Sequence, residues 1–368
     1  MKVLHVLDTL YRGGTEMQAL DVCRNAAANG LDVSVAVFGG GPLESEFENA
    51  GVPYYRLQRR LPVDPALVLK LRRIIKTEGF DIVHAHQAVD GLHAYLATIG
   101  TGVKRVLSFH GHYPDAKNRY AVNFLVPRSS ANISCSKGLL PWLREQNVDA
   151  SKNFHVIYNG VDPKRLQYDG PDLREELRLS ADALLFGMVA HFYPAARKDQ
   201  VTLCKAFASI ANDIPNAHLI VVGRVVDGAQ EKYDQCVEIC RTAGVLDRVH
   251  FLGQRDDLAK IVDGLDIYVF SSLHEGLPIS LMEAMLSKKA TILSDIEPHM
   301  EVSFDGKYAM TFETQNAADL AQKMLLLAND ENVRFELAEK AFGFATETFS
   351  IAAHLKNLKD LYNSVLDR

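Results

Sequence analysis

The segment 271–285 has the highest density of residues that could take part in chemistry. Pro278 suits the first turn of a helix, because a helix start leaves that N–H without an intrahelical partner in any case. A helix that begins there keeps the N–H groups of Ile279 and Ser280 free, and together they form an anion site. Gly276 lets the backbone approach a ligand closely. The segment therefore predicts a helix start that binds phosphate.

Two glutamates, Glu275 and Glu283, lie before and within this helix. If both were helical, their spacing would place them about 12 Å apart, which exceeds the roughly 5–9.5 Å of a hydrolytic carboxylate pair. We therefore expect different functions. Glu275 would face a cleft beside the phosphate site, and Glu283 would reach a pair of hydroxyls. The alternative is a plain helix start with two solvated glutamates.

Short apolar strands alternate with helix-like segments along the chain, which predicts a doubly wound α/β fold. Several strands, such as 219–222, are continuous apolar runs, as in a parallel sheet covered by helices on both faces. Ligands of such sheets bind outside the carboxyl ends of the strands. The predicted strands are 2–7, 33–38, 53–57, 82–84, 105–109, 132–135 and 155–158, then 184–189, 218–222, 249–252, 267–270, 290–293 and 309–312.

A chain of 368 residues is long enough for two domains at roughly 150 residues each. The segment 162–172, with two prolines and a glycine among mostly polar residues, is the best boundary. We predict a first domain over 1–165 and a second over 166–349. Residues 350–368 form an amphipathic helix without a following strand, so this helix has to pack on an existing domain.

Glu275-Gly276-Leu277-Pro278 with Glu283-Ala284-Met285 resembles the E-x7-E signature of glycosyltransferase family 4, whose members are retaining enzymes of the GT-B fold. The resemblance covers nearly the whole chain. It implies an acceptor-binding Rossmann-like first domain, a second domain that binds a nucleotide sugar, and a C-terminal helix that returns to the first domain. The other matching segments are Gly13-Gly14-Thr15-Glu16, Asp81–His86, Phe109-His110-Gly111, Ile157–Asp162 and Phe251-Leu252-Gly253.

The resemblance also implies roles for the second domain. Glu275 would lie beside the donor sugar and Glu283 would bind the nucleotide ribose. The amides near Ile279 and Ser280 would hold the diphosphate. Lys198 matches a family lysine on the diphosphate, where a cation is needed because negative charge builds up on the leaving group.

One position departs from the family pattern. The arginine that usually joins the lysine on the diphosphate is replaced by His191. Arg197 could supply the missing charge, although its side chain could also point away. The alternative for Lys198 is a solvated lysine at a helix start.

Two features of the first domain match the acceptor side of the family. Gly13 and Gly14 would let the turn after the first strand approach the diphosphate and the acceptor, unless they form only a tight strand-to-helix turn. His110, at a strand end, matches a histidine near the donor sugar. We interpret His84 and His86 as structural.

The implied reaction transfers a sugar from a nucleoside diphosphate to a hydroxyl of a glycan or lipid-linked acceptor, with retention at the anomeric carbon, as in cell-surface polysaccharide or glycolipid synthesis. The family favours a front-face mechanism, in which the leaving phosphate oxygen takes the acceptor proton, so no general base is assigned. We expect no cofactor besides the nucleotide-sugar co-substrate. We also expect no metal, since the chain has neither H-E-x-x-H nor D-x-D.

Three other functions fit the sequence less well. Nucleotide-sugar epimerases share the fold but lack the E-x7-E block. A nicotinamide-dependent oxidoreductase would need G-x-G-x-x-G after the first strand, and residues 8–14 lack it. A sugar-binding protein without catalytic activity would normally be exported, and residues 1–8 do not form a signal peptide. We therefore expect a cytoplasmic enzyme with its cysteines reduced.

The charge is uneven. Residues 1–165 contain 20 Lys+Arg and 15 Asp+Glu, whereas residues 166–368 contain 20 and 31, so the net charge of −6 divides into +5 and −11. This acidic balance argues against nucleic-acid binding. Seven basic residues lie between Arg56 and Lys76, with a predicted helix at 66–76. This stretch could bind anionic lipid headgroups at the inner membrane face, or be an ordinary solvated surface.

Overall fold

The computed structural model describes all residues except 12, 112–115, 151–152 and 196. The chain divides into two compact units. The first contains Met1–Asp162 with Thr348–Arg368, and the second contains Pro163–Glu347. The sequence placed these boundaries at 165 and 350.

The first unit is built on a seven-stranded sheet with the order β3-β2-β1-β4-β5-β6-β7. All of its strand pairs are parallel. The order runs outward in both directions from β1, which is the doubly wound arrangement. The strands are β1 (Lys2–Leu7), β2 (Asp32–Val37), β3 (Tyr54–Arg56), β4 (Ile82–Ala85), β5 (Lys104–Phe109), β6 (Ala131–Ser134) and β7 (Phe154–Val156).

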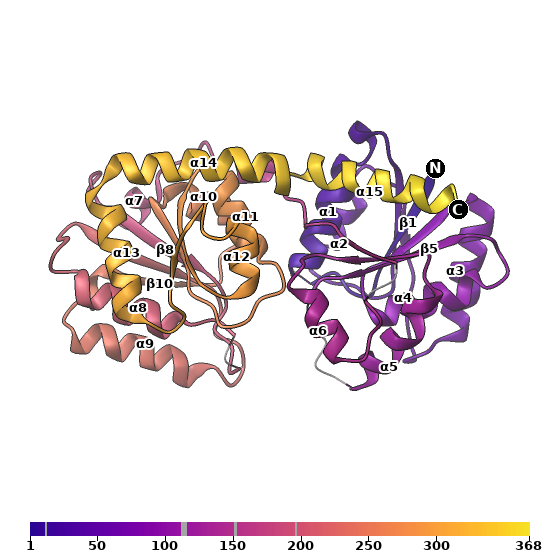
Figure 1. The fold of residues 1–368 in the computed structure, drawn as a ribbon, viewed down its shortest axis with the longest axis horizontal. Helices are drawn as coiled ribbons and strands as arrows, with labels where there is room; N and C mark the ends of the chain where they lie inside the picture. Colours follow the sequence, from indigo (N-terminus) through magenta and orange to yellow (C-terminus); the bar gives the residue numbers. More distant parts are fainter. Residues whose placement is uncertain (12, 112–115, 151–152, 196) are drawn as a thin grey trace. The chain divides into compact units, whose positions relative to one another are not determined.

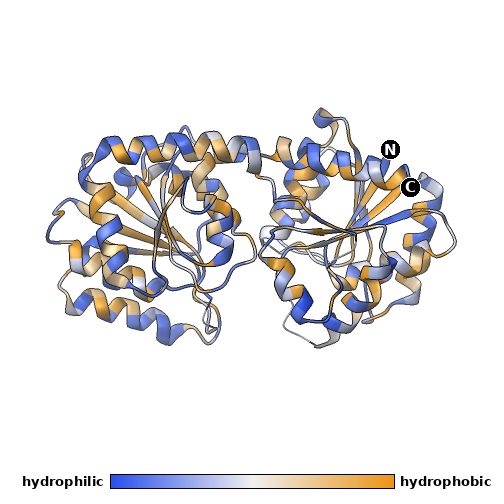
Figure 2. Cartoon of the chain, in the orientation of Figure 1, coloured by the Kyte–Doolittle hydropathy of each residue, from blue (hydrophilic) through white to orange (hydrophobic). Residues whose placement is uncertain are grey.

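Helices cover both faces of this sheet (Figure 1). The strands are largely hydrophobic, whereas the helices alternate hydrophobic and hydrophilic residues (Figure 2), as expected when each helix buries one stripe. The α-helices are α1 (Gly14–Asn25), α2 (Glu44–Glu48), α3 (Pro65–Glu78), α4 (Ala88–Thr98), α5 (Ala116–Leu125), α6 (Leu139–Glu145) and α15 (Ile351–Leu366), with 3-10 turns at Ala27–Asn29 and Val126–Arg128.

The C-terminal helix α15 is an integral part of the first unit. Ser350 caps it by accepting a hydrogen bond from the N–H of Ala353. The backbones of Val161 and Ser350 form a parallel bridge beside it. The core of the first unit includes six side chains from this helix: Ile351, Leu355, Leu358, Leu361, Tyr362 and Val365.

The second unit has a six-stranded sheet with the order β10-β9-β8-β11-β12-β13, again with parallel pairs throughout. All the predicted strands therefore exist in the described chain, and the doubly wound α/β prediction is confirmed. The strands are β8 (Leu184–Val189), β9 (Ala217–Val222), β10 (Val249–Gly253), β11 (Ile267–Phe270), β12 (Ala290–Ser294) and β13 (Met310–Phe312).

The helices of the second unit follow its strands along the chain. Pro278 is the residue before α11 rather than its first residue, so the predicted start was wrong by one position. The α-helices are α7 (Leu173–Glu176), α8 (Gln200–Ile210), α9 (Gln230–Thr242), α10 (Leu258–Gly264), α11 (Ile279–Leu286), α12 (Glu297–Ser303), α13 (Ala317–Asn329) and α14 (Glu331–Phe349), with 3-10 turns at Pro163–Leu166 and Leu246–Arg248.

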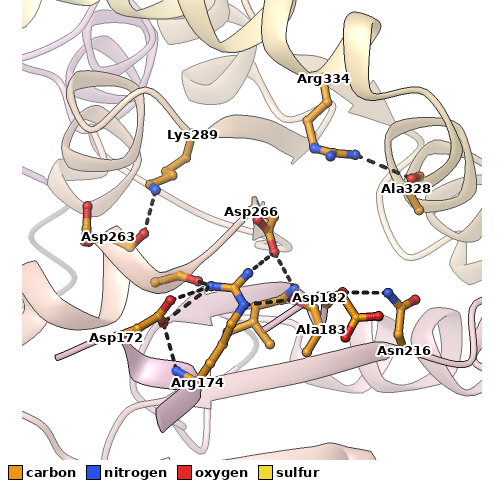
Figure 3. A network of polar contacts seen from close by, with 12 residues as sticks. Asp172, Arg174, Asp182, Ala183, Asn216, Asp263, Asp266, Lys289, Ala328 and Arg334 are labelled. Atoms are coloured by element: carbon orange, nitrogen blue, oxygen red, sulfur yellow. Dashed lines mark hydrogen bonds and ion pairs between the residues drawn. The ribbon is translucent and has the colours of Figure 1, made fainter. Parts of the chain in front are cut away.

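A polar network closes the amino end of this second sheet (Figure 3). Arg174 donates to Asp266 at 2.6 Å and to the carbonyl of Ala183 at 3.0 Å. Asp266 also accepts from the N–H of Leu185 at 2.7 Å. These groups lie where β8 and β11 begin, away from the carboxyl ends at which ligands bind. We therefore assign this network to stability.

Candidate active site

Two loops at the carboxyl ends of adjacent strands β8 and β11 are joined by backbone hydrogen bonds. Lys198 and Ser272 form an antiparallel bridge. The N–H of Asp199 donates to the carbonyl of Ser271 at 3.0 Å, and that of Leu273 donates to the carbonyl of Arg197 at 2.7 Å. The pairing of strands thus brings together two segments that the sequence had connected only through the family resemblance.

The centre of this arrangement is an ion pair between Lys198 and Glu275. The hydroxyl of Ser272 donates to the same carboxylate. The ammonium of Lys198 also lies 4.3 Å from the ring centre of Phe270, within cation–π range. The side chain of Lys198 is only 15% exposed and that of Glu275 only 11%, so solvent screens the two charges weakly.

The electrostatics of Lys198 favour an anionic ligand. Burial lowers the pKa of Lys198, and the charge and hydrogen bond of Glu275 oppose that shift. A desolvated ammonium is stabilised by any further negative charge that approaches it. A diphosphate beside Lys198 would provide such charge.

His191 does not replace the charge of the missing arginine. Its Nδ1 accepts a hydrogen bond from the N–H of Arg224 at 3.2 Å. Burial lowers the pKa of His191, and the charges of Arg224 and Lys198 lower it further, so the ring is neutral near pH 7. Its Nε2 then carries the proton and can act as a neutral donor.

The two nearby arginines differ. Arg197 has an exposed side chain, with its guanidinium 5.6 Å from the ring centre of Tyr193. Its main contribution to the loop is its carbonyl, which accepts a hydrogen bond from the N–H of Leu273. Arg224, which sequence reasoning missed, follows β9 and carries a second exposed charge beside His191.

The predicted anion site at α11 has the expected backbone. The helix begins at Ile279, directly after Pro278. The first N–H groups of a helix have no intrahelical partner, and those of Ile279 and Ser280 are among them. Gly276 precedes them in the loop that also contains Glu275. The cation, the carboxylate and the helix start therefore belong to one edge of one sheet.

Glu283 has a different partner from Glu275. It is buried on α11 and forms an ion pair with Arg165, whose guanidinium nitrogen lies 2.5 Å away. Arg165 belongs to the 3-10 turn Pro163–Leu166. No spacing in the sequence signals this pair, and sequence reasoning missed it.

In the first unit, the predicted glycines form the start of α1. Gly13 is the N-cap in an extended conformation, and Gly14 is the first residue of the helix. A Cβ on Gly13 would lie 2.6 Å from a carboxylate oxygen of Glu16. Burial raises the pKa of Glu16. The glycine therefore makes room for a partly desolvated carboxylate near the end of β1.

His110 directly follows β5 and is hydrogen-bonded to a second histidine. Its Nε2 lies 3.0 Å from Nδ1 of His86. Burial lowers the pKa of His110 to about 4, and His354 adds to the effect. His84 and His86 are buried, but their connection to His110 could not be seen in the sequence.

Three buried histidines could be considered as metal ligands, because His5, His84 and His86 have nitrogens within 4.8 Å of one another. Their nitrogens are already paired in hydrogen bonds. The rings of His84 and His86 are stacked with planes 20° apart. Lone pairs in stacked rings run side by side and do not converge on one ion. The arrangement therefore fits a hydrogen-bond chain better than a metal site.

Two family models match consecutive parts of the chain. "Glycosyltransferase Family 4" matches residues 12–165 and "Glycosyl transferases group 1" matches residues 169–343. The chain belongs to glycosyltransferase family 4. Its fold is accordingly GT-B, as the sequence predicted.

Individual relatives of this glycosyltransferase agree with that assignment. This chain is 25% identical over 329 residues to the N-acetyl-alpha-D-glucosaminyl L-malate synthase of Bacillus anthracis, and the matched region covers 87% of this chain and 84% of the relative. This chain is also 24% identical over 386 residues to an Escherichia coli UDP-Gal:alpha-D-GlcNAc-diphosphoundecaprenol alpha-1,3-galactosyltransferase. The matched region covers 98% of this chain and 96% of that relative. The crystal structure of HepE from Anabaena with UDP has the same fold, with a TM-score of 0.85, 21% identity and coverage of 99% and 100%.

The basic segment of this glycosyltransferase includes α3, which begins after the N-cap Asp64. Lys70, Arg73 and Lys76 are exposed on α3, whereas Arg72 donates to backbone carbonyls of the neighbouring segment. In the described parts of the chain, no helix combines the length and the apolar character that crossing a membrane would require.

Proposed function

We propose that this glycosyltransferase transfers a sugar from a nucleoside diphosphate to an acceptor hydroxyl with retention at the anomeric carbon. One observation carries the proposal. The buried Lys198–Glu275 ion pair and the free amides of α11 follow adjacent strands at the ligand-binding edge of the second sheet. A cation and a helix N-terminus together suit a diphosphate leaving group.

Each residue has a role in this proposal. Lys198 and the amides of Ile279 and Ser280 stabilise the diphosphate as the bond between the anomeric carbon and phosphate oxygen breaks. Glu275 positions the sugar, and Glu283 accepts hydrogen bonds from the ribose. The acceptor oxygen forms the new bond on the same face, and its proton passes to the departing phosphate oxygen. Positioning and electrostatics therefore supply the catalysis.

His191 stands where the family usually has an arginine, and this difference changes the diphosphate site. A neutral His191 can donate one hydrogen bond but adds no charge. Arg224, whose N–H donates to the ring of His191, and Arg197, which lies six residues after His191 in the chain, are both exposed cations. We propose that one of them closes on the diphosphate when the donor binds. No metal or further cofactor is part of the proposal.

Two comparisons support the choice of substrates. HepE was crystallised with UDP, and the name of the Escherichia coli relative states a UDP-galactose donor and a diphosphoundecaprenol-linked acceptor. We propose a UDP-sugar as the first donor to test and a lipid-linked glycan as the acceptor. An enzyme with such an acceptor would work at the cytoplasmic face of a membrane, where the basic α3 would contact anionic headgroups.

The test is the thermal shift of the purified protein with UDP, GDP, ADP or NAD⁺. A ligand at about 100 times its Kd adds roughly 2.7 kcal/mol of stability. We expect one nucleoside diphosphate to raise the Tm, and Lys198→Ala to abolish that increase. Lys205→Ala, an exposed lysine on the neighbouring α8, is the control and should keep it. A shift with NAD⁺ alone would overturn the proposal.

Retention is tested separately. Once a donor is identified, the anomeric configuration of the first product is read by proton NMR before it can equilibrate. The same configuration as the donor supports the proposal, and the opposite configuration refutes retention without affecting the assignment of the donor site.

A further inference from the structure

A third strand of the second sheet supports the ion pair between Lys198 and Glu275. Strand β12 pairs in parallel with β11 and ends at Ser294. The hydroxyl of Ser294 accepts a hydrogen bond from the N–H of Ser272 at 3.1 Å and donates one to the carbonyl of Ser272 at 2.7 Å. One side chain of the neighbouring strand therefore holds both backbone polar groups of Ser272.

His299 on α12 completes the hydrogen bonds of this serine. Its Nδ1 lies 3.1 Å from the hydroxyl oxygen of Ser294 and 2.9 Å from the carbonyl oxygen of the same residue. A hydroxyl has one proton and two lone pairs. The proton of Ser294 goes to the carbonyl of Ser272, so its two lone pairs accept from the N–H of Ser272 and from Nδ1 of His299. The Ser294 hydroxyl thereby uses its full hydrogen-bonding capacity.

The contacts at Nδ1 determine the tautomer of His299. Burial lowers the pKa of His299 to about 4, so the ring is neutral near pH 7 and only one of its nitrogens is protonated. An unprotonated Nδ1 would direct its lone pair at the carbonyl oxygen of Ser294, whereas a protonated Nδ1 donates to that oxygen. Nε2 is buried and has no hydrogen-bond partner among the described residues in either tautomer, and a buried unpaired acceptor is tolerated better than a buried unpaired N–H. Both observations place the proton on Nδ1.

Ser272 connects this arrangement to Glu275. The hydroxyl of Ser272 donates to Oε1 of Glu275, which is also the oxygen that pairs with Lys198. The other oxygen, Oε2, accepts no hydrogen bond from any residue that the structure describes. Ser272, Ser294 and His299 are fully buried, so solvent does not compete for their hydrogen bonds.

The ring of His299 also packs beside the support of the ammonium. Its centre lies 5.4 Å from that of Phe270, the last residue of β11. The ammonium of Lys198 lies 4.3 Å from the centre of the same Phe270 ring. His299 thus contacts two residues that support the ion pair, Ser294 on the side of the carboxylate and Phe270 on the side of the ammonium. Close packing in a buried core leaves little room for either to shift.

We propose that Ser294 and His299 are positioning residues, which hold Ser272 so that Glu275 keeps Oε1 on Lys198 and presents Oε2 to the donor sugar. The part that concerns the sugar rests on the proposed function, whereas the hydrogen bonds do not depend on it. Both side chains are fully buried, so they act through Ser272 and touch no ligand themselves.

The tautomer of His299 is measured without any substrate. Nitrogen chemical shifts of the full-length protein labelled with ¹⁵N-histidine distinguish a protonated ring nitrogen from an unprotonated one, and His299→Asn assigns the signals. We expect a protonated Nδ1 and an unprotonated Nε2 at pH 7. A protonated Nε2 would overturn the proposal, because His299 could then not donate to Ser294 in the neutral state.

A double-mutant cycle tests the connection to Glu275, again without a ligand. Ser294→Ala and Glu275→Ala are made singly and together. Hydrogen exchange of the slowest amides of the second sheet reports the unfolding equilibrium of that unit. Because both side chains contact Ser272, we expect the effect of the double variant to differ from the product of the single effects by at least about two-fold. Effects that simply multiply would overturn the proposal.

The matched control is Ser303→Ala. Ser303 is a fully buried serine of α12 whose hydroxyl bonds to the carbonyl of Met300 and the N–H of Gly306. It should destabilise the unit, but its effect should multiply with that of Glu275→Ala. His299→Leu should couple to Glu275→Ala as Ser294→Ala does, whereas His299→Asn, which keeps an N–H donor, should not.

Ligand measurements separate this proposal from the proposed function. UDP has no sugar, so its Kd should change by less than about two-fold in Ser294→Ala. Hydrolysis of a UDP-sugar should fall about ten-fold, since a hydrogen bond to a charged group is misplaced. The probes are UDP-glucose, UDP-galactose and UDP-N-acetylglucosamine without an acceptor.

Parallel losses of UDP affinity and hydrolysis in Ser294→Ala would overturn the specific effect on Glu275. If the unchanged protein binds neither UDP nor any of the three sugars, the proposed function fails for a uridine donor. The double-mutant cycle then still decides whether Ser294 positions Glu275.

Discussion

A guanidinium nitrogen of Arg165 lies 2.5 Å from a carboxylate oxygen of Glu283, and the two side chains are only 18% and 8% exposed. Glu283 is the carboxylate proposed to bind the ribose. The ion pair holds one of its oxygens in place before any ligand arrives. Arg165 therefore positions the carboxylate and offsets its burial.

Removing this arginine should destabilise the second unit. Arg165→Ala leaves the largely buried Glu283 without its cation, which costs on the order of 3 kcal/mol for a buried pair. We expect a lower Tm and weaker nucleotide binding, measured by thermal denaturation with and without UDP. The control is Arg241→Ala, which breaks an exposed ion pair with Glu238 and should change neither quantity. An unchanged Tm in Arg165→Ala would contradict the role of the pair.

A second prediction concerns the glycine of the Asn159-Gly160 segment. A Cβ on Gly160 would lie 2.5 Å from Cβ of His354 and 3.0 Å from Cα of Ile351. Gly160→Ala should therefore push α15 away and cost about 1–3 kcal/mol in the free energy of unfolding. Denaturant-induced unfolding of both proteins measures this change in the free energy of unfolding.

The matched comparison is Gly343→Ala. Gly343 is exposed within α14, and a Cβ there meets no atom within 4 Å. Alanine is the better helix former, so this variant should gain about 0.5–1 kcal/mol. Equal effects of the two substitutions would show that Gly160 does not pack closely against α15.

The buried histidines make stability depend on pH. Burial lowers the pKa of His5 to about 3 and those of His110 and His354 to about 4. In the unfolded chain a histidine titrates near 6.5, so between about pH 4 and 6.5 the unfolded state binds more protons than the folded one. The contribution of these histidines to the free energy of unfolding is therefore fully present above about pH 7. It is lost progressively as the pH drops below 6.5.

Each of these histidines contributes up to about 1.4 kcal/mol per pH unit inside that window. We expect the Tm to decrease steadily from pH 7 to pH 5 and to change little between pH 7 and 8. Thermal denaturation in matched buffers at constant ionic strength tests this. A Tm at pH 5.5 equal to that at pH 7.5 would show that the rings are charged or exposed in the folded state.

The last prediction tests the membrane-facing role of α3. Lys70→Glu with Arg73→Glu should abolish binding to vesicles of anionic lipid, because each basic residue near the surface contributes about 1 kcal/mol. Co-sedimentation at low and high salt measures it. Lys205→Glu with Arg241→Glu makes the same charge change on exposed residues of the second unit and should leave binding intact. Failure of the unchanged protein to bind at any salt concentration would refute the membrane contact.

Local sequence patterns determined most of the strands and one helix start of this protein. Continuous apolar runs alternating with amphipathic segments predicted the strands of both parallel sheets, because a strand buried on both faces needs no polar positions. Within one short segment, Gly276, Pro278 and Ile279 predicted a helix start that can bind an anion. These features depend only on residues that are close together in the chain, so the sequence alone predicts them.

Tertiary structure decided which distant side chains meet. Lys198 and Glu275 are brought together because β8 and β11 are adjacent in the sheet, although they are not adjacent in the chain. The pairing of Arg165 with Glu283 likewise depends on how a turn packs against α11.

The buried histidines His5 and His84 are the clearest case. Parallel pairing of β1 with β4 places His5 opposite His84, and the returning helix α15 adds Tyr362 between them. From the sequence, these were separate residues without a shared spacing. Only the strand register and the docking of α15 define the contacts, because hydrogen bonds depend on distances between atoms that chain order does not specify.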